Sequence, residues 1–84
     1  MALTEEAEAL LRRRKQSYLE FSESPGGMIL LADLAKFCRA HETTFHPDPR
    51  VAANLDGRRE VWLRIQHFLK LDINTLWKIY GDGT

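Results

Sequence analysis

The sequence has few of the features that mark secreted or membrane-spanning proteins. It contains one cysteine, Cys38, so it cannot form an internal disulfide, which favours a reducing compartment. Its longest apolar run, Met28–Ala32, is far shorter than the roughly 20 residues that a membrane span requires. The acidic start at Glu5 and Glu6 lacks the basic segment of a signal peptide. We therefore expect a cytoplasmic protein without a membrane partner.

The sequence also lacks net charge, because 12 Lys and Arg residues offset 12 Asp and Glu residues. Non-specific binding to nucleic acid depends on concentrated positive charge, so it is not favoured for the chain as a whole. The one basic run spans residues 12–15, where Arg12 and Arg13 are candidate contacts to phosphate or to an acidic partner. Four consecutive residues wrap around a helix, so a solvated, ion-paired surface is the simpler interpretation.

Helical signals fill most of the chain, and its length fits a single domain, residues 1–84. Residues suited to begin helices stand before four periodic segments; they are Thr4, Ser24, Asp48 and Asp72. The expected helices are at about 4–22, 25–40, 49–70 and 72–80. We predict an all-α fold, a compact bundle of three main helices plus a short C-terminal fourth helix.

The segment Met28–Cys38 is the most apolar part of the chain, with only Asp33 and Lys36 charged. A helix that is apolar nearly all round belongs in the middle of a bundle, so we expect this one to be central. We expect Phe45 to hold the following loop against the core. Gly57, inside the next predicted helix, indicates close contact with another helix.

At 100° per residue, apolar residues of the third predicted helix form one broad arc with Phe68 at its edge, and basic residues lie on or beside it. The arc consists of Val51, Leu55, Trp62, Ile65 and Leu69. Arg58 falls inside the arc and Arg59 at its border. Because an isolated charge is costly to bury, we expect Arg58 to pair with a carboxylate such as Asp33 or Asp48 and to bridge helices. Alternatively, Arg58 lines a groove and receives a partner's carboxylate or phosphate.

No residue set indicates catalysis or a bound cofactor. Cys38, His41 and His46 could supply three metal ligands, but structural zinc sites more often use two pairs of ligands in which cysteine dominates. Nucleophilic catalysis would need a pocket-forming motif beside such residues, and none accompanies them. We therefore expect a non-enzymatic protein with no cofactor and no metal.

Four short motifs lie between Phe21 and Ile65: Phe21-Ser22-x-x-Pro25-x-Gly27, Leu31-Ala32-Asp33-Leu34-x-x-Phe37-Cys38, Phe45-x-Pro47-Asp48-Pro49 and Gly57-Arg58-Arg59-x-Val61-x-Leu63-Arg64-Ile65. Together they resemble a family of small proteins of tailed bacteriophages and prophages, usually of the short-tailed kind, encoded near packaging and portal genes. The resemblance covers about residues 17–68 and brings no catalytic residues. It implies a phage context and a role in head assembly or DNA packaging.

Residues and resemblance together predict a protein–protein interaction module in the cytoplasm of the host bacterium, with association with the virion left open. Its partner would be a phage structural or packaging protein, and a homo-oligomer is compatible with this. One alternative is a phage protein that inhibits a host enzyme or defence system; another is a nucleic-acid binder with a local basic patch. The candidate partner-binding residues are Arg58, Arg59, Phe45, Asp48, Arg12, Arg13 and Trp77.

Overall fold

The computed structural model describes residues 4–81, which form four helices and no strand. The helices are α1 (Glu5–Glu23), α2 (Pro25–Phe37), α3 (Pro49–Lys70) and α4 (Ile73–Tyr80). The predicted all-α class, with three main helices and a short fourth, is confirmed. The helix α2 ends at Phe37, three residues before its expected end at residue 40.

Each helix is capped at its start by the residue that the sequence predicted. In every case a side-chain oxygen accepts a hydrogen bond from a backbone N–H of the first turn, which satisfies a donor that has no partner within the helix. Because the signal is local, it is read directly from the sequence. The four N-caps are Thr4, Ser24, Asp48 and Asp72.

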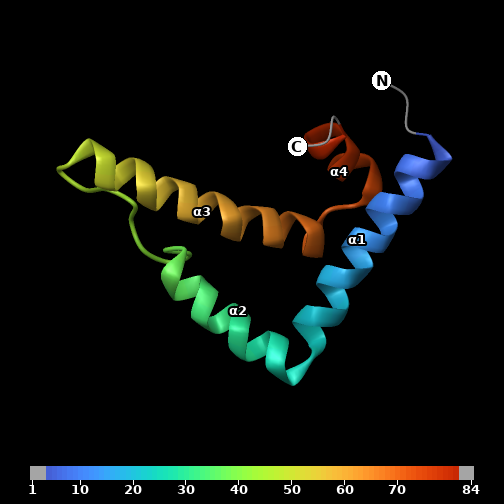
Figure 1. The fold of residues 1–84 in the computed structure, drawn as a ribbon, viewed down its shortest axis with the longest axis horizontal. Coiled ribbons are helices and arrows are strands. Elements are labelled where there is room, and N and C mark those ends of the chain that lie inside the picture. Colours follow the sequence, from blue (N-terminus) through green and yellow to red (C-terminus); the bar gives the residue numbers. More distant parts are fainter. Residues whose placement is uncertain (1–3, 82–84) are drawn as a thin grey trace.

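The three long helices form the sides of an open triangle (Figure 1). The helix α1 meets α2 at one corner. From the far end of α2, α3 returns toward the middle of α1, and α4 lies beside α1 in the corner where α3 meets α1. The principal extents are 46 × 34 × 14 Å. A helix with its side chains is about 10–12 Å across, so the molecule is one helix layer thick.

The corner between α1 and α2 is tight because Gly27 has no side chain. The first turn of α2 lies against the backbone of Phe21, where a Cβ on Gly27 would overlap the Phe21 carbonyl. The Ser24 hydroxyl, besides capping α2, donates to the same carbonyl at 2.8 Å. The chain therefore changes direction between the two helices without a loop.

The core lies in the corner where α1, α3 and α4 meet. Phe68 of α3 is fully buried, and its ring stacks between Tyr18 of α1 and Tyr80 of α4, with centroid distances of 4.7 and 5.3 Å. The sequence placed Phe68 only at the edge of its apolar arc, because periodicity does not show from which side the neighbouring helices approach. The buried members of this cluster are Leu11, Phe68, Ile73 and Leu76.

Lys15, a member of the basic run, is part of this corner. Its Nζ donates to the carbonyls of Phe68 and Leu69 at 2.9 and 3.3 Å, in the last turn of α3. A positive charge is favourable there because the carbonyls of the last turn point outward and carry the negative end of the helix dipole. One of the four basic residues therefore has a structural role.

The expected central position of Met28–Cys38 is wrong. The helix α2 forms an outer side of the triangle, and α1 and α3 approach it only toward its two ends (Figure 1). Met28, Ile29 and Leu30 are exposed, whereas Gly27 and Cys38 are buried. An apolar sequence indicates that a surface avoids water, but it does not show that the same chain covers it.

We expect Phe68→Ala to lower the free energy of unfolding by about 3–5 kcal/mol, because it removes the middle ring of the stack and leaves a cavity. Phe21, 41% exposed on α1, is the matched control, and Phe21→Ala should cost clearly less. Urea unfolding followed by circular dichroism measures both. Equal losses in the two variants would contradict the position of the core.

Stability should depend on the ionisation of Asp72 in acid. The backbone N–H of Thr75 donates to its carboxylate at 2.8 Å, and this bond, followed by one from the Thr75 hydroxyl, lowers the pKa of Asp72. A pKa lower in the folded chain than in the unfolded one stabilises the fold above the unfolded value of about 3.9. That contribution is lost as the pH falls through the folded pKa.

The variant Asp72→Asn keeps an N-cap but removes the charge, so it should unfold at nearly the wild-type urea concentration at neutral pH. Below about pH 4 it should lose less stability than the wild type. Urea midpoints between neutral pH and pH 3 measure the difference. Parallel losses in both proteins would show that Asp72 does not contribute to the acid sensitivity.

Candidate functional site

A groove with a volume of about 410 Å³ lies between α2 and α3. Its apolar lining comes mainly from Leu34 and Phe37 on α2 and from Gly57 and Val61 on α3, with the buried thiol of Cys38 beside them. Phe37 and Val61 are 54% and 53% exposed. We name this surface the α2–α3 groove; it exposes apolar side chains that a folded chain normally covers.

Arg58 is the charged residue that lines this groove. Its guanidinium carbon lies 4.2 Å from the centroid of the Phe37 ring, which is cation–π geometry. The expected ion pair with Asp33 or Asp48 is not present among residues 4–81, so that prediction is wrong. The ring of Phe37 takes the place of a carboxylate because the end of α2 faces Arg58 across the groove.

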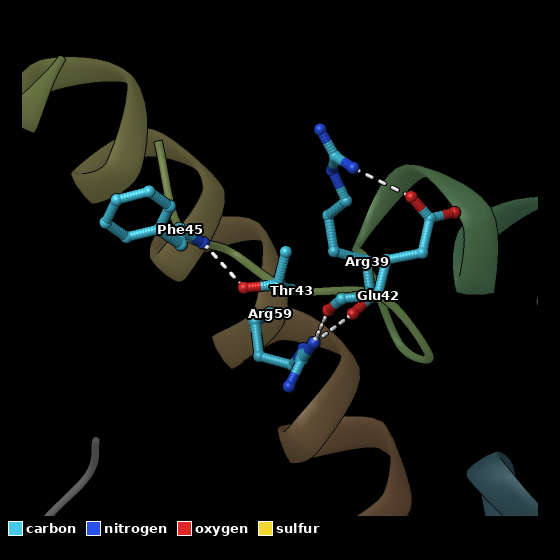
Figure 2. Close-up of polar contacts among 5 residues, drawn as sticks. All are labelled: Arg39, Glu42, Thr43, Phe45 and Arg59. Carbon is cyan, nitrogen blue, oxygen red and sulfur yellow. Dashed lines mark hydrogen bonds and ion pairs between the residues drawn. The ribbon is translucent and has the colours of Figure 1, made fainter. Parts of the chain in front are cut away.

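Arg59, rather than Arg58, bridges separate parts of the chain. Its Nη2 donates to the carbonyls of Arg39 and Glu42 in the connection between α2 and α3 (Figure 2). Its Nε is buried and has no hydrogen-bond partner in the described part of the chain. Because its head group is held by backbone carbonyls, Arg59 is less available to a partner than the sequence suggested.

The carbonyls that Arg59 binds are placed by the end of α2. Arg39 has a positive φ of 56°, and the N–H groups of Arg39 and Ala40 donate to the carbonyls of Lys36 and Ala35. This is the Schellman pattern, in which glycine is the usual left-handed residue. The sequence carried no glycine here to indicate it, which is why the helix end and the role of Arg59 were missed.

Phe45 was expected to hold the loop against the core, and that prediction is wrong. It is 76% exposed, and its ring extends away from Arg59 (Figure 2). Its backbone N–H donates to the Thr43 hydroxyl at 3.0 Å, a local turn that needs no help from the ring. Asp48 is already engaged, because its carboxylate caps α3 by accepting from the Arg50 N–H at 2.9 Å.

The remaining candidates lie in other parts of the molecule. Arg12 and Arg13 line a groove of about 720 Å³ between α1 and the start of α4. Glu8 and Asp72 line the same groove, and Glu8 forms an ion pair with Arg12 at 2.7 Å, so positive charge is not concentrated there. Trp77 is partly buried and packs against the core cluster.

A second apolar surface lies on α2 and was missed because its residues were assigned to the core. Met28, Ile29 and Ala32 are all exposed, and Ile29 is 73% exposed. At 100° per residue these three lie together on the helix, on the side opposite Leu34. We name them the outer stripe. The sequence does contain a signal for the outer stripe, because a helix that is apolar all round has more apolar surface than one core can cover.

Within residues 4–81, no three His, Cys, Asp or Glu side chains are grouped so that they could hold a metal ion. No helix in the described part of the chain is both long and apolar enough to cross a membrane.

The geometry defines a small all-α protein whose distinguishing feature is apolar surface on α2 and α3 that the chain leaves uncovered. A family model for Bbp19-like phage proteins matches residues 20–78, more than half of the chain. The chain belongs to this family of phage proteins. Neither the curated proteins nor the solved structures contain a match to it.

The different roles of Arg58 and Arg59 can be tested by stability. Arg59→Ala removes a charged donor from two backbone carbonyls and should cost about 2–3 kcal/mol, with Arg59→Lys in between. Arg58→Ala, its neighbour on the same helix, loses only a partly exposed cation–π contact and should cost about 0.5–1 kcal/mol. Urea unfolding measures all three. A larger loss of stability in Arg58→Ala than in Arg59→Ala would instead identify Arg58 as the residue that bridges separate parts of the chain.

Proposed function

We propose that this phage protein is a non-enzymatic interaction module that docks on another phage protein during head assembly or DNA packaging. The observation that carries the proposal is the outer stripe of α2. Three neighbouring apolar side chains on an exposed helix face are typical of helix-in-groove binding, in which such residues act as anchors. The proposed partner is a structural or packaging protein with an apolar groove, met in the host cytoplasm or in the virion.

Two features support a protein partner over nucleic acid. Covering exposed apolar side chains with a protein surface lowers the free energy, whereas a charged phosphate backbone does not bury apolar side chains. The basic residues that a nucleic-acid binder would use lie apart: Arg12 is paired with Glu8, Lys15 caps α3, and Arg59 holds the loop.

The proposal is tested by capture from phage-infected cells with the tagged protein after nuclease treatment, read by mass spectrometry. We expect head, portal or terminase proteins to be recovered with the wild type. Ile29→Ser should reduce that recovery at least about tenfold, since losing one well-placed apolar anchor can cost 2 kcal/mol or more of binding. The fold should be unaffected, because Ile29 is exposed.

Leu10→Ser is the matched control, because Leu10 is another exposed apolar residue but lies on α1, away from the outer stripe. It should leave recovery unchanged. Recovery of a single host enzyme at comparable stoichiometry would instead make this protein an inhibitor of a host function. Equal recovery with Ile29→Ser and the wild type would remove the outer stripe as the docking surface.

A further inference from the structure

We infer that the α2–α3 groove is the interface of a symmetric homodimer, in which the groove face of one copy packs on the same face of a second copy. The groove face consists of Leu34, Phe37, Gly57 and Val61 together with Leu30, which lies one helical turn before Leu34 and is half-exposed. This surface is separate from the outer stripe, so the inference does not depend on the proposed docking partner.

The dimensions of the chain show how much surface is left uncovered. Its accessible surface is 6198 Å², whereas a folded monomer of 9.7 kDa exposes about 5,100 Å². Its radius of gyration is 14.9 Å, against about 12 Å for a compact domain of 84 residues. The excess area, roughly 1,000 Å², belongs to the open fold as a whole, and it is large enough to include the roughly 800 Å² that each partner buries in a stable interface.

The thickness of the molecule points to a second copy rather than to an unrelated partner. Domains are built from at least two packed layers, and this chain supplies a single layer 14 Å thick. Stacking an identical triangle on the groove face provides the second layer. A two-fold axis makes the contact reciprocal and closed, so both grooves are covered in one step.

Gly57 gives an independent reason to place another backbone at this groove. Glycine is among the least favourable residues in a helix interior, yet within the described chain nothing lies within 4 Å of the Cβ position at Gly57. The close helix contact that the sequence predicted is therefore absent among the residues that the structure describes. Ala53, Gly57 and Val61 are four residues apart on one exposed ridge of α3, where a second copy can approach closely.

The charges on this face permit self-association. Arg58, the charged group of the groove lining, lies against the Phe37 ring. Asp33, one helical turn before Phe37 on α2, is exposed and carries the charge opposite to that of Arg58. Two identical faces therefore offer each acid a base, and a chain with no net formal charge does not repel its copy.

Sedimentation equilibrium of the purified chain between about 1 and about 100 µM tests the inference. We expect a dimer, and a thermal midpoint that rises with protein concentration, because subunit binding stabilises the folded state. Gly57→Leu and Val61→Asp should each weaken self-association at least about tenfold. Neither change clashes within the chain, since the Gly57 position is open and Val61 is half-exposed.

Asp56→Leu is the matched control, because it adds the same side chain one residue away on another face of α3, and it should leave the dimer intact. A wild type that stays monomeric at every concentration overturns the inference. So does a dimer that tolerates both groove variants, or a closed ring of more than two copies. The Ile29-dependent capture is measured separately, so either surface can fail while the other stands.

Discussion

The stacking of Phe68 between Tyr18 and Tyr80 is the interaction on which the rest of the structure depends. It joins α1, α3 and α4 in one corner, where the buried cluster lies. From that corner α1 and α3 extend as two arms, and α2 closes the triangle at their far ends (Figure 1). Burial is therefore concentrated at one corner. On the opposite side of the molecule, α2 is held at one end by the contact at Gly27 and at the other end by the buried Cys38 and the carbonyls that Arg59 binds.

The sequence was sufficient for the helices because their signals are local. A capping side chain such as Ser24 or Asp72 acts within its own first turn, so it can be read without knowing the fold. The short fourth helix was also predicted, and Ile73 and Leu76 within it are buried. The position of α2 could not be read in this way, because apolar composition does not identify what covers a helix.

The candidate site shows the same limit at the level of single side chains. Helical periodicity placed Arg58 in the apolar arc and Arg59 at its border, but the partner of each was decided by where the loop after α2 runs. That loop follows from Arg39 in a left-handed conformation, which nothing in the sequence indicated. Carbonyls therefore hold Arg59 and an aromatic ring holds Arg58, where a carboxylate was expected.

The apolar composition of α2, although it did not place the helix correctly, is the feature that gives the strongest support to the proposed function. A helix that is apolar on every side needs several neighbours, but this chain buries α2 only at its ends, at Gly27 and Cys38, and covers Leu31, Leu34 and Ala35 in part. Two sides of α2 remain uncovered. One lines the α2–α3 groove and the other carries the outer stripe, on the opposite side of the helix. A second copy on one side and a phage protein on the other would together restore the central position that the sequence demanded. In that proposed assembly α2 would be central to several chains rather than to one, and its apolar composition would be explained by the two proposed partners.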